Sequence, residues 1–242
     1  MNIVKLDAID STNDYLKDLV RKHALENYSV VTAELQTNGK GQRGSTWSSE
    51  KGKNIIMSML VRDFSLSTSS IFDLNIVVSL AVLHSLIPLN IPKLAIKWPN
   101  DIMSDDKKIG GILIENCFKS GSGVDSVIGI GLNINQLEFE DLPQASSLAL
   151  ISRATIDRDV LLESIVIAIQ ENIKYWKLNA QLLTDRYTNL LFKRDEKMVF
   201  QDSDLLFFNG VIRGITTMGR LIIEHENGNL LDYDIKQVKM IF

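Results

Sequence analysis

Residues 96–115 read Ile-Lys-Trp-Pro-Asn-Asp-Ile-Met-Ser-Asp-Asp-Lys-Lys-Ile-Gly-Gly-Ile-Leu-Ile-Glu, and this stretch has the pattern of a hairpin. Residues 94–97 form the first expected strand, which ends at Pro99 because proline has no backbone N–H to donate to a neighbouring strand. Residues 105–107 form a polar turn, and an apolar run begins again at Ile109.

A hairpin that only shapes the fold does not need the polar side chains that gather at one end of this one. They are Lys97, Asn100, Asp101 and Lys108. Gly110 and Gly111 open the second strand, although glycine weakens a strand and often marks close approach of a ligand. The polar turn alone would be a solvated turn, and the Trp-Pro pair alone would be packing. Their combination favours a binding site.

The same residues resemble a known signature. Residues 97–101 match the Lys-Trp-Pro-Asn-Asp motif of biotin protein ligases, and residues 108–115 match their Lys-(x)-(Gly/Ala)-Gly-Ile-Leu-(x)-Glu motif. These enzymes attach biotin to carboxylase carrier domains. The resemblance implies an α+β fold in which helices flank a mixed β-sheet, as in class II aminoacyl-tRNA synthetases. It also implies a small C-terminal β-barrel like that of Src-homology-3 domains.

The overall composition is that of an ordinary globular protein. The 242 residues are 45% hydrophobic and 23% charged, which is enough chain for one large domain and a small one. A net charge of −4 without a sustained run of Lys and Arg disfavours a nucleic-acid partner. The single cysteine, Cys117, agrees with a reducing cytoplasm, and we find neither a secretory signal nor a membrane span.

Hydrophobic spacing predicts the order of the elements. Strands are expected over residues 2–6, 29–34, 54–61 and 125–134, and helices after Ser11 and over residues 74–85, 157–176 and about 180–191. Residues 66–70 should cap the second helix, and residues 145–150 should form a loop. From residue 196 the pattern changes to short alternating strands over 197–201, 205–215, 220–224, 230–234 and 237–241. We expect a catalytic domain over residues 1–192 and a closed barrel over 193–242.

The first helix begins with Ser11, Thr12 and Asn13. Ser11 is suited to cap this helix, and capping by itself explains both hydroxyl residues. The resemblance implies a second role, because biotin ligases carry Ser-Thr-Asn at this place to bind the ureido head of biotin. Both roles are compatible, since a helix N-terminus offers unpaired donors to a ligand as readily as to its own cap.

Residues 34–47 form a glycine-rich loop that carries Lys40 and Arg43. Alone, this loop is weak evidence for phosphate binding, because it is neither a P-loop nor a dinucleotide fingerprint. In biotin ligases a Gly-Arg-Gly-(Arg/Gln)-(Arg)-Gly-x-x-Trp loop occupies this position and orders over the adenylate. Lys40 replaces the usual Arg and loses its bidentate fork, and Gln42 has no charge, so we expect Arg43 to be the main cation. The resemblance implies that Trp47 stacks on adenine.

A third glycine pattern lies at residues 129–133, Gly-Ile-Gly-Leu-Asn. By itself it is as well explained by a bulge in a strand. The resemblance implies instead that Gly129 and Gly131 lie beside the fused rings of biotin, and that Asn133 reaches the nucleotide.

The resemblance covers nearly the whole chain and implies a set of site residues. Biotin would contact Ser11, Thr12, Asn13, Gln36, Gly39, Lys40, Gly41, Gln42, Lys108, Gly111, Gly129 and Gly131. ATP would contact Lys40, Arg43, Trp47, Lys97, Asn100, Lys108 and Asn133. We expect Lys108 and Arg43 to stabilise the phosphate during adenylation, Asp101 to accept the proton of the acceptor lysine, and Asn100 with Asp101 to bind Mg²⁺.

The implied reaction makes biotinyl-5′-AMP from biotin and ATP, and transfers the biotinyl group to a lysine of a biotin carboxyl carrier protein. A lipoate ligase is the first alternative, but its Arg-Arg-x-x-Gly-Gly-Gly loop is missing. A DNA-binding biotin sensor is the second, but only ten residues precede Ser11. We therefore expect a ligase without a DNA-binding domain, cytoplasmic, with neither a nucleic-acid nor a membrane partner. An exposed strand edge would allow a homodimer.

Overall fold

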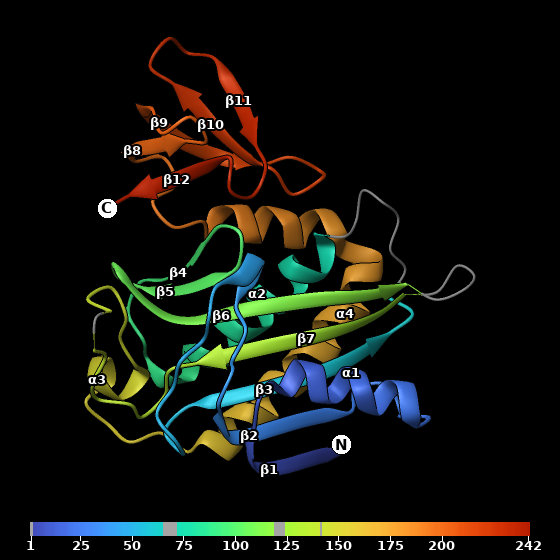
Figure 1. Ribbon diagram of the computed structural model, residues 1–242. Helices are drawn as coiled ribbons and strands as arrows, with labels where there is room; N and C mark the ends of the chain where they lie inside the picture. The colour runs from blue at the N-terminus through green and yellow to red at the C-terminus, as the bar shows by residue number, and fades with distance from the viewer. Residues whose placement is uncertain (1, 65–71, 119–123, 141) are drawn as a thin grey trace.

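The computed structural model describes residues 2–64, 72–118, 124–140 and 142–242. These residues form a large mixed β-sheet with helices on both faces and a second, smaller sheet near the C-terminus (Figure 1). The two sheets correspond to the two parts predicted from the sequence. The boundary that we propose after residue 192 falls between the last helix and the first strand of the smaller sheet.

The large sheet has seven strands in the order β1-β2-β3-β7-β6-β5-β4. Only β1 and β2 are parallel, and every other neighbouring pair is antiparallel. The strands are β1 (Ile3–Ile9), β2 (Val30–Gln36), β3 (Ile55–Arg62), β4 (Leu94–Lys97), β5 (Asp101–Ser104), β6 (Lys107–Phe118) and β7 (Val124–Leu132). The predicted mixed α+β sheet is confirmed.

Helices cover the two faces of this sheet unequally. The helices are α1 (Thr12–Lys22), α2 (Asp73–Leu86), α3 (Leu148–Ser152) and α4 (Arg158–Asn189). Both α2 and α4 pack on one face and bury the main core, whereas α1 packs on the other face around Leu16 (Figure 1). Twelve of the fourteen residues of α2 are buried, which explains its apolar composition. The α1 face remains only partly covered, and the candidate site lies there.

The local signals that start the helices act as expected. The Ser11 hydroxyl accepts a hydrogen bond from the Asp14 N–H, and Asp157 accepts from the N–H groups of Asp159 and Val160. The two predicted C-terminal helices are both present within α4, and they meet at a kink where the backbone of Asn179 departs from helical geometry. The expected cap at residues 66–70 lies outside the described residues.

Two expectations differ from the structure. The predicted hairpin has an additional strand, β5, because the chain reverses at residues 98–100 and again at residues 105–106. β5 is four residues long, begins at the polar residue Asp101 and lies between two turns, so its sequence reads as part of a polar turn. The loop expected at residues 145–150 includes the start of α3, a single turn of helix capped by the Ser147 hydroxyl.

The C-terminal sheet has five antiparallel strands in the order β11-β10-β9-β8-β12. They are β8 (Lys197–Asp202), β9 (Phe207–Ile215), β10 (Leu221–His225), β11 (Leu230–Tyr233) and β12 (Val238–Ile241). This sheet fits the predicted Src-homology-3-like unit. Within the described ranges no ladder pairs β11 with β12, so backbone hydrogen bonds do not close the sheet into a barrel. No described helix has the length and hydropathy required to cross a membrane.

Candidate active site

Glycines form the floor of the site because of strand alternation. Successive residues of a strand point to opposite faces. In β7, Ile128, Ile130 and Leu132 point into the main core, so Gly129 and Gly131 lie on the α1 face. Gly131 is paired with Gly111 of β6. Three glycines therefore leave a bare patch of backbone on which a flat ligand can lie.

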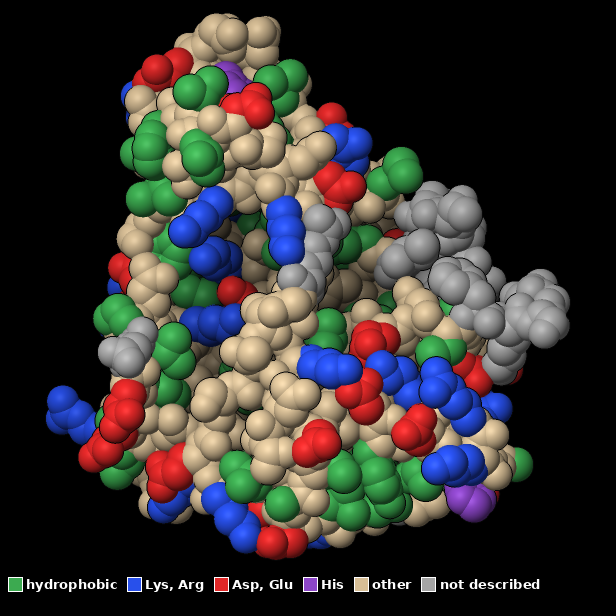
Figure 2. Space-filling view, in the orientation of Figure 1, with side chains coloured by type: hydrophobic (Ala, Val, Ile, Leu, Met, Phe, Trp, Pro, Cys, Tyr) green, Lys and Arg blue, Asp and Glu red, His purple; other side chains and the backbone are tan. Residues whose placement is uncertain are grey.

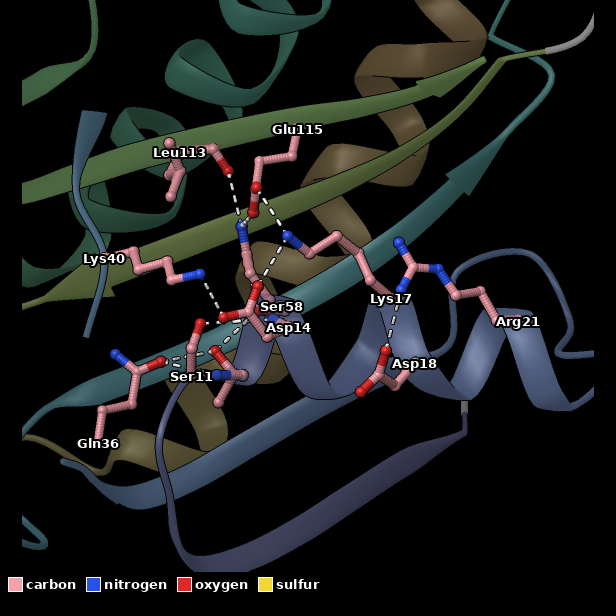
Figure 3. Close-up of polar contacts among 12 residues, drawn as sticks. Ser11, Asp14, Lys17, Asp18, Arg21, Gln36, Lys40, Ser58, Leu113 and Glu115 are labelled. Carbon is pink, nitrogen blue, oxygen red and sulfur yellow. Dashed lines mark hydrogen bonds and ion pairs between the residues drawn. The ribbon is translucent and has the colours of Figure 1, made fainter. Parts of the chain in front are cut away.

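The N-terminus of α1 supplies a cluster of buried polar groups above this floor. The Thr12 N–H donates to Gln36 Oε1 at 2.8 Å. Ser58 Oγ lies 2.7 Å from Thr12 Oγ1 and 2.5 Å from Asn13 Oδ1 (Figure 3). Ser58 was missed by the sequence analysis, although it is the one polar residue in the apolar run of β3. The structure thus brings together Ser11, Thr12, Asn13 and Gln36, the four residues near α1 that were predicted to contact biotin.

A chain of charged groups continues from this cluster (Figure 3). Asn13 donates to Glu115 Oε2 at 2.8 Å, and Lys17 bridges Glu115 and Asp14 with two contacts of 2.8 Å. Lys40 of the glycine-rich loop reaches the other oxygen of Asp14 at 2.5 Å. Burial raises the pKa of Asp14, but the Lys17 and Lys40 ammonium groups outweigh it and hold that pKa below its ordinary value.

This arrangement gives Glu115 and Lys40 roles that the sequence did not indicate. Glu115 closes the motif of residues 108–115, and its carboxylate orients Asn13 from the same face of the sheet as α1. Lys40 was expected to contact biotin and phosphate, whereas here its ammonium group fastens the loop to α1 through Asp14. This ion pair positions the loop, and Lys40 also lines the cavity, so its predicted contact with biotin and phosphate stays a prediction.

The glycine-rich loop folds back on itself. The Trp47 N–H donates to the Gly39 carbonyl at 2.9 Å, and the Gly41 N–H donates to the Ser45 carbonyl at 2.7 Å. A Cβ on Gly39 would lie 2.3 Å from the Trp47 carbonyl oxygen, so this close approach requires glycine. Residues Gln42–Gly44 form a 3₁₀ turn at the loop's tip. The side chain of Arg43 lies outside the described part of the structure, and its predicted role stays a prediction.

The indole of Trp47 lies over the glycine floor. A Cβ on Gly131 would come within 2.5 Å of the ring, and one on Gly111 would lie 3.6 Å from it. The Trp47 Nε1–H is buried without a hydrogen-bond partner within the described residues. The ring is therefore held by packing and by the nearby Lys108 ammonium group, without a hydrogen bond from its Nε1–H, which allows it to exchange the floor for a nucleobase.

A β-bulge directs Lys108 into the site. In the β5–β6 ladder, Ile102 pairs with Gly110 but Met103 pairs with Lys108, so Ile109 is an extra residue. Ile109 is consequently fully buried in the main core, and Lys108 points to the same face as Gly111. Its ammonium group lies 2.6 Å from Asp101 Oδ1 and 5.8 Å from the centre of a Trp47 ring.

Three other residues were predicted to contact the nucleotide: Lys97, Asn100 and Asn133. Lys97 is half-buried, with its ammonium group 4.5 Å from the centre of the Phe242 ring. The Asn100 Nδ2 donates to the Ile112 carbonyl, which leaves its amide oxygen for a ligand. Asn133 is 5% exposed and donates to the Ser146 carbonyl at 3.0 Å, away from the cavity. We therefore assign Asn133 to holding the loop before α3, in place of the expected nucleotide contact.

These features surround a cavity of about 630 Å³. It is lined by most of the predicted site residues: Ser11, Thr12, Asn13, Gln36, Lys40, Gly41, Gln42, Trp47, Lys97, Asn100, Asp101, Lys108, Gly111, Gly129 and Gly131. The C-terminal sheet forms the opposite wall with Phe200, Asp202, Ser203, Leu205 and Lys239. Figure 2 shows basic side chains gathered in the hollow below this sheet. No sequence signal indicated these residues, because only the docking of the two sheets brings them to the cavity.

Fold and site together define a ligase with a glycine-floored pocket for a small acid. The model of the biotin/lipoate A/B protein ligase family matches residues 6–133, more than half of the chain, and the chain belongs to this family. Within the family it resembles the biotin ligases, as the following relatives indicate.

The bifunctional ligase/repressor BirA of Salmonella typhimurium is 29% identical over 230 residues, which are 93% of this chain and 70% of the relative. The biotin–[acetyl-CoA-carboxylase] ligase of Mycobacterium tuberculosis is 29% identical over 91% of this chain and 83% of the relative. The biotin protein ligase of Aquifex aeolicus, solved in complex with biotin and ATP, has the same fold. It superposes with a TM-score of 0.82 at 24% identity, covering 99% of this chain and 98% of that structure.

Proposed function

We propose that this protein is an ATP-dependent biotin ligase, which forms biotinyl-5′-AMP and transfers the biotinyl group to a lysine of a biotin carboxyl carrier domain. The observation that carries the proposal is the arrangement inside one cavity. A bare glycine floor lies between a polar cluster at the start of α1 and the Lys108–Asp101 ion pair. A ligand with a polar head, a flat ring system and an anionic tail matches these three parts in that order.

Biotin has these three parts. Its fused rings would lie on Gly129 and Gly131, where a side chain would leave no room. Its ureido group would replace contacts within the cluster of Thr12, Asn13 and Ser58. A site built to hydrogen-bond such a head rejects acids that lack it, because buried polar groups would lose their partners.

The carboxylate of biotin would then lie near Lys108. In the first step a carboxylate oxygen attacks the α-phosphorus of ATP, the bond from that phosphorus to the bridging oxygen breaks, and pyrophosphate leaves. Lys108 provides a fixed positive charge for the two anions that must approach each other. Trp47 would leave the glycine floor as biotin arrives and stack on adenine, while the loop stays tied to α1 through Lys40 and Asp14.

Magnesium would enter this site with the nucleotide. Mg²⁺ prefers carboxylate, amide and phosphate oxygens and retains several waters, so it does not need a cage made by the protein alone. The Asp101 carboxylate and the Asn100 amide oxygen fit this preference, and the described residues contain no cluster of three or more acidic, His or Cys ligands. When bound, the ion would neutralise part of the phosphate charge.

The second step transfers the biotinyl group. The amine of the acceptor lysine attacks the carbonyl carbon of biotinyl-AMP, the bond from that carbon to the phosphate oxygen breaks, and AMP leaves. Free lysine has a pKa of about 10.4, so the amine must lose a proton near neutral pH. Asp101 would accept that proton once Lys108 turns from it toward the phosphate of the adenylate.

The family also contains lipoate ligases, so the acid must be tested directly. Pyrophosphate exchange into ATP should depend on biotin and should be absent with lipoate or without an acid. Exchange with lipoate alone would assign the other substrate of the family. Absence of exchange with both acids would favour a binding protein that retains only the pocket.

The remaining expectations concern partners and location. We propose that the acceptor is a biotin carboxyl carrier protein and that the protein acts in the cytoplasm. The net charge of −4 disfavours a nucleic-acid partner. The homodimer also stays a prediction. Its simplest interface would use β1 or β4, which are the edge strands of the large sheet.

A further inference from the structure

Residues 98–100 form the turn that leads into β5, and each of them is anchored to another part of the chain. The Trp98 Nε1–H donates to the Gly219 carbonyl, between β9 and β10, at 2.9 Å. Asn100 is bound twice to Ile112 of β6: the Ile112 N–H donates to the Asn100 carbonyl at 3.0 Å, and the Asn100 Nδ2 donates to the Ile112 carbonyl. Turns on a protein surface are usually solvated and variable, so this degree of anchoring needs a reason.

The middle residue of the turn is held by two donors from the protein core. The Pro99 carbonyl accepts a hydrogen bond from Asn75 Nδ2 of α2 at 2.5 Å and from the Tyr187 hydroxyl of α4 at 3.1 Å. Tyr187 is fully buried, and Asn75 is 9% exposed. An amide and a phenol buried among the apolar side chains of two helices cost free energy unless they find partners. One carbonyl oxygen is the partner of both, so the turn is tied to the packed core.

The Asn75 side chain contributes little to stability in this position. Its amide oxygen is buried and has no hydrogen-bond partner within the described residues. Such an acceptor has lost its bonds to water without replacement, which destabilises the folded state. Leucine has a similar shape without this cost, and the Pro99 carbonyl would still accept from Tyr187. The fold alone would therefore be served better by leucine, and the amide has another role.

The residues that follow the Pro99 carbonyl are those that the proposed mechanism uses. Asn100 has its amide oxygen free for Mg²⁺, and Asp101 lies 2.6 Å from the Lys108 ammonium group. β5 is four residues long, and the bulge disrupts its ladder with β6, so the turn has to supply part of the positioning. A displacement of about 1 Å at a reacting group can reduce a rate about 100-fold.

We infer that Asn75 and Tyr187 are positioning residues for the ligase reaction. Through the Pro99 carbonyl they keep Asn100 and Asp101 directed into the cavity. Neither Asn75 nor Tyr187 lines the cavity itself. This inference rests on the proposed function and extends its machinery to two helices that do not contact the substrates. Biotin affinity should not depend on either residue, because the polar cluster at the start of α1 would bind the ureido group.

The test compares Tyr187→Phe and Asn75→Leu with Tyr233→Phe. The last variant also removes one tyrosine hydroxyl, which contacts His225 in the C-terminal sheet and lies outside the cavity lining. In Tyr187→Phe and Asn75→Leu, transfer from preformed biotinyl-AMP should slow about tenfold, and the Mg²⁺ concentration for half-maximal pyrophosphate exchange should rise. Tyr233→Phe should match the wild type in both assays. Asn75→Leu should need at least as much urea to unfold as the wild type, because an unpaired buried oxygen is removed.

A double-mutant cycle separates a positioning role from a structural one. In Asp101→Asn the group to be positioned for transfer is already lost, so adding Asn75→Leu should slow transfer by less than about twofold. Multiplication of the two single effects would overturn the inference, and so would wild-type transfer in both Asn75→Leu and Tyr187→Phe. A fall in biotin affinity or in the urea midpoint of Asn75→Leu, in parallel with its transfer rate, would assign Asn75 to packing and also overturn it.

Hydrogen exchange tests the inference independently of the reaction. If the wild type shows neither pyrophosphate exchange nor transfer, the proposed function fails, but the anchoring of the turn can still be measured. The Ile112 N–H donates to the Asn100 carbonyl, whereas the Thr12 N–H donates to Gln36 away from the turn. Tyr187→Phe should increase the exchange rate of the Ile112 amide relative to that of the Thr12 amide. An unchanged ratio of the two rates would overturn the inference.

Discussion

Replacing Gly129 with alanine should damage the polar cluster of the site by adding a single methyl group. A Cβ at this position would lie 2.5 Å from Asn13 Oδ1 and 3.1 Å from the Cγ and Nδ2 atoms of the same side chain. Asn13 is 3% exposed and cannot move freely, because Ser58 and Glu115 hold the two ends of its amide at 2.5 and 2.8 Å. The methyl group therefore forces the amide out of its contacts.

The magnitude follows from two unfavourable contributions and one favourable contribution to the free energy of unfolding. Overpacking of this kind costs about 1–3 kcal/mol, and a buried polar group without its partner costs about 1–3 kcal/mol more. Alanine recovers about 0.5–1 kcal/mol, because glycine loses more backbone entropy on folding. We expect the free energy of unfolding to fall by about 2–3 kcal/mol, and biotin affinity to fall by at least about tenfold because Asn13 no longer faces the ligand.

Gly131→Ala is the matched control for stability. Its Cβ would meet the ring of Trp47, which belongs to a loop and whose Nε1–H donates no hydrogen bond to any described residue. The ring can move away, so the free energy of unfolding should change by less than about 1 kcal/mol. Urea denaturation of both variants and calorimetric titration with biotin measure these quantities. Equal stability of Gly129→Ala and the wild type, or a greater loss in Gly131→Ala, would refute the reasoning.

Three further changes test other parts of the site. Lys108→Ala should reduce biotin-dependent pyrophosphate exchange by about 100-fold or more with normal unfolding, since a fixed charge at the reacting phosphate is lost; wild-type exchange would remove Lys108 from catalysis. Asp101→Asn should slow the transfer from preformed biotinyl-AMP most strongly below pH 8, and the rate of the variant should approach that of the wild type as pH rises. A variant that transfers at the wild-type rate at every pH would exclude the role of Asp101 as the base. Asp73 has a pKa raised to about 6 by burial, so the folded state binds more protons than the unfolded state between about pH 4 and 6. Its contribution to stability is present below pH 4 and lost above pH 6. Urea denaturation should therefore show that the free energy of unfolding of Asp73→Asn, relative to that of the wild type, increases by about 1 kcal/mol between pH 4 and pH 7, a value reduced for the partial exposure of Asp73. A difference between the two proteins that does not change with pH would contradict this.

Local sequence determined much of this molecule. The caps at Ser11 and Asp157, the strands with alternating apolar residues, and the motifs at residues 97–101 and 108–115 each depend on residues close together in the chain. Hydrogen-bonding side chains at helix starts and alternation in strands act over a few residues, so they can be recognised without knowing the fold. The glycine positions that form the floor were indicated by the family resemblance of their motifs, because the pattern of residues 129–133 alone fits a bulge equally well.

Tertiary structure alone decided which way the motif residues face and what they meet. Simple alternation from Ile112 would place Lys108 in the main core, but the extra residue Ile109 takes that place and turns Lys108 into the cavity. Lys40 pairs with Asp14 because the glycine-rich loop lies against α1, and Lys239 reaches the cavity because the C-terminal sheet docks opposite the floor. Bulges, ion pairs and docked walls depend on residues far apart in the chain, whose positions follow only from the complete packing.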